Sequence, residues 1–391
     1  MMAATQKQVP EKVATQQAET QQAKTQQPAT KKVASSKLAT QKIACAPQIG
    51  DYHIVADMLM QRLLGYETLT CPPMTKRTVE LGARYSPDMV CTPVKTTLGN
   101  LIEAAELGAN VFVMPGAGCR LGFYDILQKQ VLTDLGYDFE MFTLFDYIPT
   151  TKRLFQSFQA FQPTLTKDHF DAVFETVAQV TMDMDRLADT IRRNVAFEQN
   201  AGEFDRHYRN YLNQVKTASD AQTAKQLATS FESILGSVAI NKPDRPVRIG
   251  IIGEIYVVAE PFANCYLEAW LIDHKVEIDR RASLSQMAVA VFSVDQQIEN
   301  SGDYVRYNIG STANDAIAQA YDMASNNIDG IIHVKPASCS PEITAMSVLQ
   351  NISRDFDIPI MYLTFDTETS EAGLQTRLEA FLDMILMKGL K

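Results

Sequence analysis

The sequence predicts an α/β protein with two Rossmann-like parallel-sheet domains facing a cleft, a helical insertion and a disordered N-terminal tail. Three observations predict this architecture. Strand and helix patterns alternate in two separate stretches, which is typical of parallel sheets covered by helices. A stretch poor in Gly and Pro, with apolar spacing of about 3.6 residues, separates them. A low-complexity segment without aromatic residues precedes them. The predicted segments are residues 1–44 for the tail, 45–150 for the first α/β domain, 151–245 for the helical segment and 246–391 for the second α/β domain.

The tail consists mainly of Gln, Ala, Thr and Lys, and its first glycine lies beyond it, at Gly50. Such a composition buries too little apolar surface to offset the entropy lost on ordering, so we expect it to be disordered.

In the first α/β domain, short apolar runs predict strands and amphipathic stretches predict helices. The predicted strands are residues 66–70, 88–90, 110–114 and 138–145. The predicted helices are residues 74–83, 94–109 and 122–136.

The helical segment and the second α/β domain follow the same reasoning. Residues 168–195 and 221–240 have the helical period over their whole length, and they predict long helices. The predicted strands of the second domain lie at residues 247–252, within 274–282, at 330–334 and within 358–366. A helix over residues 373–389 follows the last strand.

Composition and charge narrow the range of partners and compartments. The net charge of −10 argues against a nucleic-acid partner, since phosphate binding needs clustered Lys and Arg. No apolar run approaches the roughly 18–20 residues of a membrane helix, so we expect no membrane association. The N-terminus lacks the apolar core of a secretion signal, and we therefore expect a cytoplasmic protein.

Three of the six cysteines occupy similar predicted positions. Cys91, Cys119 and Cys339 each follow a predicted strand and precede a predicted helix, with Ser340 as the expected N-cap and Pro341 as the first residue of the third helix. In parallel α/β sheets these loops meet at the carboxyl edge of the strands, where ligands bind. Helix N-termini favour thiolate over thiol and suit an anionic iron–sulfur cluster, so three thiols converging from two domains would form a metal site.

The alternative for each single cysteine is a small buried side chain of the core, and periodicity does not decide between the two. Cys71 also fits the strand–loop–helix pattern and is a fourth candidate. Cys265 is expected in a helix interior, and Cys45 is expected to be incidental beside the tail.

Other common motifs fit less well. The segment GAGCRLG misses the dinucleotide fingerprint by one residue and lacks the Lys-Ser/Thr of a P-loop. The cysteines are too far apart for a usual zinc site, and the five His residues do not cluster with them.

Four longer segments resemble one protein family: SPDMVCTPVKTTLGNLIEAAELGANVFVMPGAGCRLGFYDILQKQVLTDLGYDFE, RIGIIGEIYVVAEPFANCYLEAWL, HVKPASCSPEITAMSVL and FDTETSEAGLQTRLEAF. They are similar to the family of 2-hydroxyacyl-CoA dehydratase subunits, benzoyl-CoA reductase subunits and double-cubane cluster proteins. The stand-alone members related to CoA activases are the most similar. The resemblance covers about residues 50–391 and leaves the tail outside.

The resemblance implies a [4Fe–4S] cluster held by Cys91, Cys119 and Cys339, with one iron left open to a ligand. A double-cubane cluster needs about twice as many thiolates, and Cys45 and Cys265 are poorly placed to supply them. The family's partner is an ATP-hydrolysing iron–sulfur activase, and members commonly form homo- or heterodimers. This chain lacks a P-loop, which fits the recipient of electrons rather than the ATPase.

Side chains near the predicted ligands are candidates for binding a ligand or tuning the cluster. Lys95 and Arg120 could bind a phosphate or carboxylate, with a solvated helix-start cation as the alternative for each. Glu254 and Tyr256 follow the first strand of the second domain. The remaining candidates are Asn264, Ser338, Ser340 and Glu342.

The expected function is that of an iron–sulfur protein of anaerobic metabolism, receiving low-potential electrons for a reductive or radical dehydration, as a lyase or an oxidoreductase component. The alternatives are a metal-free two-lobed protein that binds a small molecule, and a cluster carrier or scaffold without turnover.

Overall fold

The computed structural model describes residues 41–116, 124–145, 150–292, 294–310 and 312–389. The predicted tail lies outside the described residues except for residues 41–44. Residues from Gln41 onward belong to one compact unit.

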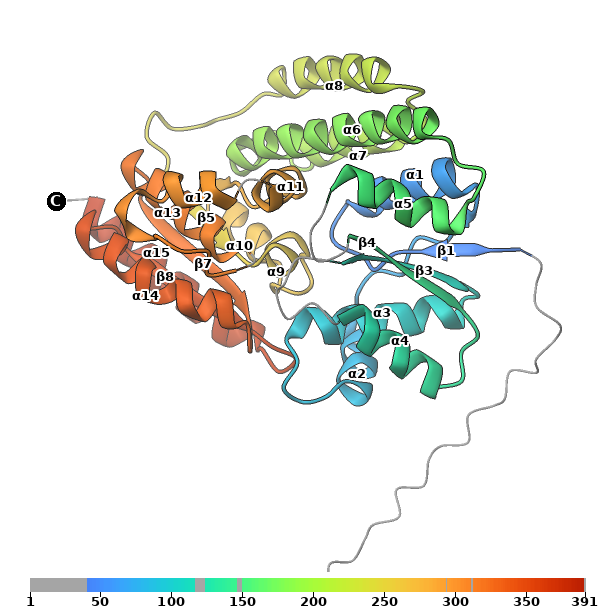
Figure 1. The fold of residues 1–391 in the computed structure, drawn as a ribbon. Coiled ribbons are helices and arrows are strands. Elements are labelled where there is room, and N and C mark those ends of the chain that lie inside the picture. The colour runs from blue at the N-terminus through green and yellow to red at the C-terminus, as the bar shows by residue number, and fades with distance from the viewer. Residues whose placement is uncertain (1–40, 117–123, 146–149, 293, 311, 390–391) are drawn as a thin grey trace, which may run out of the picture. The chain divides into compact units, whose positions relative to one another are not determined.

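The first sheet has four strands, all parallel, in the order β2-β1-β3-β4. Figure 1 labels β1, β3 and β4 of this sheet. These strands are β1 (Ile43–Cys45), β2 (Glu67–Thr68), β3 (Val111–Gly116) and β4 (Glu140–Phe145). The connecting helices are α1 (His53–Leu59), the π-helical η1 (Met60–Leu64), α2 (Lys76–Tyr85), α3 (Thr92–Glu106) and α4 (Tyr124–Asp134). Strand β1 begins at Ile43, in residues that the sequence analysis gave to the tail, and Ala44 pairs with both Thr68 and Val111.

The predicted strand at residues 88–90 is wrong. This segment is a turn between α2 and α3. Pro87 lacks an N–H for a strand ladder, and only four residues follow it before α3 begins at Thr92. The connection from β2 to β3 therefore contains two helices in succession.

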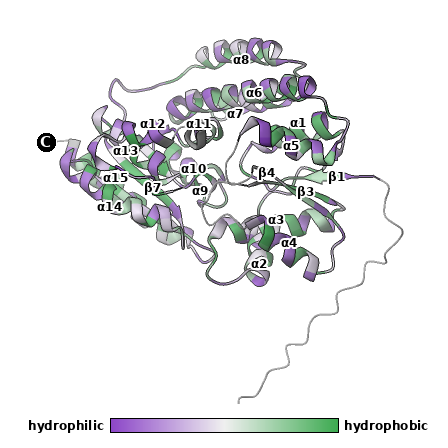
Figure 2. Ribbon diagram, viewed as in Figure 1, coloured by the Kyte–Doolittle hydropathy of each residue, from purple (hydrophilic) through white to green (hydrophobic). Residues whose placement is uncertain are grey.

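The helical segment contains α5 (Thr151–Phe161), α6 (Lys167–Asn194), the 3₁₀ turn η2 (Val195–Phe197), α7 (Glu203–Val215) and α8 (Ala221–Gly236). Thr166 caps α6 by accepting a hydrogen bond from the His169 N–H. Figure 2 shows both hydrophilic and hydrophobic colours along α6, as expected of an amphipathic helix.

The second sheet also has four parallel strands, in the order β6-β5-β7-β8. These strands are β5 (Arg248–Gly253), β6 (Glu277–Arg280), β7 (Gly330–Pro336) and β8 (Ile360–Phe365). Its helices are α9 (Ile255–Ala259), α10 (Leu267–Asp273), α11 (Leu284–Phe292), α12 (Val294–Asn300), the 3₁₀ turn η3 (Gly302–Tyr304), α13 (Ala313–Ser325), α14 (Ser340–Asp355) and α15 (Glu371–Gly389).

Two parallel sheets with many helices confirm the predicted α/β class. Each sheet has a topological switch point, because its second strand lies on one side of its first strand and its third strand lies on the other side. The switch point lies between β1 and β3 in the first sheet and between β5 and β7 in the second. Ligands of open α/β sheets bind beyond the carboxyl ends of the strands at such points. Among the described residues, no helix is long and apolar enough to cross a membrane.

Candidate metal centre

Cys91 lies at the N-terminus of α3, although it does not follow a strand as the sequence predicted. It is the N-cap residue, in an extended conformation (φ −69°, ψ 158°), and only 9% of it is exposed. Its sulfur lies 3.2 Å from the Tyr124 hydroxyl at the start of α4, and either atom can donate. The thiol is thus held at the point where α3 and α4 begin.

Two glycines fix the path of the chain into Cys91. A Cβ added at Gly82 on α2 would lie 1.7 Å from the Lys95 carbonyl oxygen, and one at Gly99 on α3 would lie 1.9 Å from the Thr78 carbonyl oxygen. These contacts are with backbone, which cannot move aside as a flexible side chain can. Helices α2 and α3 therefore pack backbone against backbone, and this close packing sets where the turn between them, ending at Cys91, must lie.

Hydrogen bonds join the start of α3 to the second sheet. The Thr92 hydroxyl donates to the carbonyl oxygen of Phe365, the last residue of β8, at 3.0 Å. The Thr96 hydroxyl donates to the Tyr256 hydroxyl, also at 3.0 Å. Cys91, next to Thr92, is consequently carried to the carboxyl edge of the second sheet.

Cys339 follows β7 at that same edge. The chain leaves β7 through Ser338, whose φ of 66° is left-handed, and Cys339 is the N-cap of α14. The expectation that Ser340 is the N-cap is wrong by one residue, since Ser340 is the first helical residue. Across the switch point, Glu254 follows β5 and caps α9 by accepting hydrogen bonds from the Tyr256 and Val257 N–H groups.

The electrostatics around Cys339 differ from the sequence expectation. Burial raises the pKa of its thiol well above the ordinary value, and the carboxylates of Glu342 and Glu254 and the thiol of Cys91 raise it further. The Glu342 backbone N–H at the helix start lowers this pKa, but by less than the other groups raise it. At Cys339, burial and the neighbouring carboxylates therefore outweigh the predicted preference of a helix N-terminus for thiolate. Cys91 is thus among the groups near enough to Cys339 to affect its pKa.

A buried polar chain supports the helix that begins after Cys339. Glu342 and His333 are both fully buried, and the His333 Nε2 lies 2.8 Å from the Glu342 carboxylate. The Thr312 hydroxyl donates to the other oxygen of the same carboxylate at 2.7 Å. Because these bonds connect α14 to β7 and to the start of α13, they hold the first turn of α14 in place. The sequence made Glu342 a candidate for binding a ligand or tuning the cluster. In the structure, its carboxylate stabilises the first turn of α14.

Lys335 is a site residue that sequence reasoning missed. It lies in β7, only 6% of it is exposed, and no ion pair to its ammonium is found among the described residues. Burial lowers its pKa, while the neighbouring Cys339 and Glu342 raise it. A buried cation without a paired carboxylate, beside Cys339, suits an anionic group at this edge. The signal in the sequence was the pair of titratable residues His333 and Lys335, alternating within an apolar strand.

The remaining candidates are placed as follows. Lys95 donates a hydrogen bond to the Asp88 carbonyl oxygen at 3.0 Å and so stabilises the turn before Cys91. Tyr256 is buried and its hydroxyl also contacts the Met74 sulfur at 3.2 Å, so it joins the two α/β halves. Asn264 is buried and bonds only to backbone groups of its own loop. Cys119 and Arg120 lie outside the described residues.

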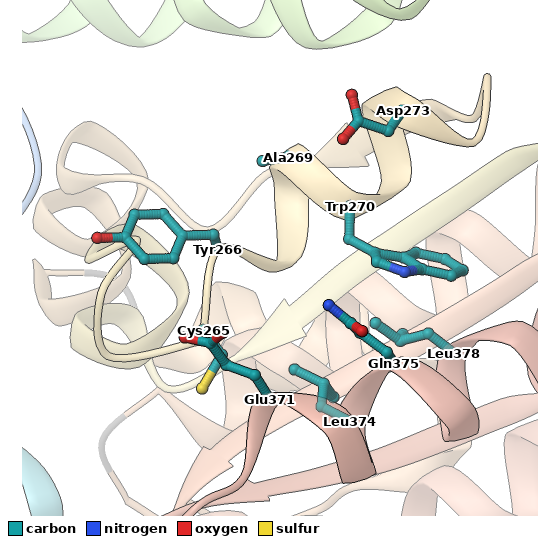
Figure 3. A pocket seen from close by; sticks show the side chains of 9 residues that line it. All are labelled: Cys265, Tyr266, Ala269, Trp270, Asp273, Glu371, Leu374, Gln375 and Leu378. Atoms are coloured by element: carbon teal, nitrogen blue, oxygen red, sulfur yellow. The ribbon is translucent and has the colours of Figure 1, made fainter.

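The other cysteines lie apart from Cys91 and Cys339. Cys45 and Cys71 are buried in the core of the first α/β half, where an interaction with Cys45, together with burial, raises the pKa of the Cys71 thiol. Cys265 is not in a helix as predicted. It has a left-handed φ of 53° in the turn before α10, and its side chain lies with Glu371 in a pocket of about 180 Å³ between α10 and α15 (Figure 3).

Two of the three predicted ligands are thus brought to one edge of one sheet. Among the described residues, no group of three His, Cys, Asp or Glu side chains is arranged to hold a metal ion. The donor set nevertheless fits a cysteine-bound cluster in two respects: Cys91 and Cys339 lie at helix starts near one edge, and the buried cation of Lys335 lies near Cys339.

The comparisons with known proteins concern the C-terminal part of the chain. No curated protein matches the sequence significantly. Residues 255–385 match a family described as 2-hydroxyglutaryl-CoA dehydratase, D-component. The matched range includes Lys335, Cys339 and Glu342, and it supports the resemblance to the 2-hydroxyacyl-CoA dehydratase family seen in the sequence.

Proposed function

We propose that this chain is a cytoplasmic iron–sulfur protein of the 2-hydroxyacyl-CoA dehydratase type. In this proposal Cys91, Cys119 and Cys339 bind a [4Fe–4S] cluster, and an ATP-hydrolysing iron–sulfur activase supplies its low-potential electrons. The reaction served is a reductive or radical dehydration, performed by a homo- or heterodimer.

The observation that carries the proposal is that Cys91 and Cys339, far apart in the sequence, each lie at a helix start near one edge of the second sheet. The Thr92–Phe365 hydrogen bond and the effect of Cys91 on the Cys339 pKa support this arrangement. A packing role alone gives no reason for two cysteines at the starts of two helices to lie near the same edge. When bound, the cluster would supply electrons and an open iron for a substrate oxygen.

The chain's own residues have definite roles in this proposal. Lys335 offsets negative charge next to Cys339, and Tyr124 contacts the Cys91 sulfur and can donate a hydrogen bond to it. The Glu342 carboxylate, held by His333 and Thr312, fixes the helix start behind Cys339. Since Cys45 and Cys71 are core residues and Cys265 lies in a separate pocket, a cluster with three ligands fits better than a double cubane.

Single Cys→Ser substitutions test the proposal. Protein purified without oxygen from iron-replete cells should contain about four irons per chain and absorb broadly near 400 nm, as cysteine-bound clusters do. Cys91→Ser, Cys119→Ser and Cys339→Ser should each lose iron, whereas the control Cys265→Ser should keep it. Equal iron content in all four variants would contradict the proposed ligands, and modest, unequal losses of stability without any iron would instead favour a metal-free binding protein.

A further inference from the structure

A buried arginine near the end of α6 has no counterion. Arg192 is 6% exposed, and no carboxylate among the described residues forms an ion pair with it. Its guanidinium makes one hydrogen bond, from Nη2 to the Arg280 carbonyl oxygen at 3.4 Å, and its buried Nε has no partner. Burying a charge without a partner costs several kcal/mol, on the order of the whole effect of a severe mutation, so this guanidinium needs an explanation.

A second buried guanidinium lies beside the first. Arg280 is the last residue of β6, and its side chain is 11% exposed. Its Nη1 donates to the Glu268 carboxylate at 2.7 Å and to the Val258 carbonyl oxygen at 3.2 Å, but its buried Nε also has no partner. Burial, together with the charge of Arg280, lowers the pKa of Arg192. The two cations therefore repel each other, and no carboxylate among the described residues forms an ion pair with Arg192.

A tyrosine hydroxyl completes the cluster. Tyr208 interacts electrostatically with both Arg192 and Arg280, and no hydrogen bond from its hydroxyl is found among the described residues. The nearby Tyr52 differs, because its hydroxyl donates to Asp185 and accepts from the Leu284 N–H. Two buried donors, Arg192 Nε and Arg280 Nε, are thus without partners, and the Tyr208 hydroxyl forms no hydrogen bond with the described residues.

The carboxylates around this cluster are already engaged elsewhere. Each has a partner other than Arg192: Glu268 with Arg280, Asp189 with Arg193, Asp185 with Tyr52 and the Ser285 N–H, and Asp51 with Arg209. A side-chain rearrangement that neutralised Arg192 would therefore have to break one of these bonds.

We propose that Arg192, Arg280 and Tyr208 form a binding site for an oxyanion group, a carboxylate or a phosphate. The guanidinium fork matches the oxygens of both groups, and an anion between the two arginines would supply the missing partners of all three donors. The site lies at the carboxyl end of β6, on the sheet edge that also holds Cys339 and where ligands of parallel sheets bind. The inference does not depend on the iron–sulfur cluster.

Binding of inorganic phosphate and of acetate to the purified protein tests this site. Both are titrated at constant ionic strength against chloride, by calorimetry and by the shift in thermal unfolding. At least one oxyanion should bind and raise the unfolding temperature more than chloride does. Arg192→Met should weaken that binding roughly 10–100-fold, the range expected for lost hydrogen bonds to a charged group.

Two further variants keep the test decisive. Arg354→Met removes an exposed cation of α14 that pairs with Asp355, away from the cluster, and should leave oxyanion binding unchanged. Tyr208→Phe removes a hydroxyl that forms no hydrogen bond with the described residues, so it should not unfold the protein. It should weaken oxyanion binding about 3–10-fold, and it tests the site even if Arg192→Met fails to fold. Phosphate binding would indicate a phosphate ligand, and acetate binding alone a carboxylate. No oxyanion effect beyond that of chloride, or an equal effect in the wild type and in Tyr208→Phe and Arg192→Met, would overturn the proposal.

Discussion

The Thr92 hydroxyl donates a hydrogen bond to the Phe365 carbonyl oxygen at 3.0 Å and so ties the helix that carries Cys91 to the sheet that carries Cys339. Thr92 is only 5% exposed, and the same carbonyl also accepts the Ala337 N–H, from the loop that leads to Cys339. The Phe365 carbonyl oxygen therefore accepts hydrogen bonds from both segments next to the proposed ligands, the start of α3 beside Cys91 and the loop before Cys339.

Removing the Thr92 hydroxyl should weaken the attachment of the start of α3, next to Cys91, to the second sheet. Thr92→Val keeps the shape of the side chain but loses its donor, and we expect the free energy of unfolding to fall by about 1 kcal/mol, the usual worth of such a bond. Iron should also be lost to a chelator faster than from the wild type. Urea unfolding and timed iron release measure the two effects. Thr92→Ser keeps the hydroxyl and is the control; if it behaves like Thr92→Val, the hydrogen bond is not the cause.

The close packing of α2 against α3 should tolerate no side chain at Gly82. In Gly82→Ala the new Cβ would lie 1.7 Å from the Lys95 carbonyl oxygen, and the helices would have to move apart. We expect a loss of about 3 kcal/mol or more, at the upper end of the range for overpacking a core. Gly373→Ala on α15, where no atom lies within 4 Å, is the control and should be neutral or slightly stabilising. Thermal unfolding of both variants is the measurement, and similar unfolding temperatures would contradict the packing described here.

Asp315 on α13 should make stability depend on pH. Burial, and then the charge of Glu342, raise the pKa of this carboxyl to about 7, although its hydrogen bond from Gln319 acts in the opposite direction. The folded state therefore holds a proton that the unfolded state has released above its ordinary pKa of about 4. Stability from this group is complete below about pH 4 and is lost as the pH rises through 7, by about 2–4 kcal/mol at most.

Asp315→Asn isolates this effect, because the amide cannot ionise. The variant should match the wild type at or below about pH 4 and become increasingly more stable than the wild type as the pH rises to 8. Urea unfolding across this range measures the difference. Parallel pH profiles for the two proteins would show that the carboxyl titrates normally in the folded state.

Much of the fold follows from local patterns in the sequence. The strands β3, β4, β5, β7 and β8 were predicted because each is a run of several apolar or β-branched residues. Strand β1 was missed because Ile43–Cys45 is too short to show a period, and it is defined only by its pairing with β2 and β3. Residues 88–90 were predicted as a strand because the segment ends in apolar residues. They form a turn, because Pro87 precedes them and α3 begins shortly after them.

The candidate site was predicted less completely, for a tertiary reason. Cys339 could be located from its own strand and helix. Cys91 was chosen by a loop rule that does not apply to it, and it reaches the second sheet through glycine packing and the Thr92 hydrogen bond, neither of which a local pattern reveals. The helical period of α6 likewise gives no sign that Arg192 lacks a counterion, because this depends on residues of β6, α7 and α10.

Diffraction at the iron absorption edge tests the account most directly, on crystals of the chain grown without oxygen. We predict an anomalous peak within bonding distance of both the Cys91 and the Cys339 sulfur atoms, with the Cys119 sulfur as its third protein ligand. The absence of an iron peak between the Cys91 and Cys339 sulfur atoms, in protein prepared from iron-replete anaerobic cells, would contradict the account.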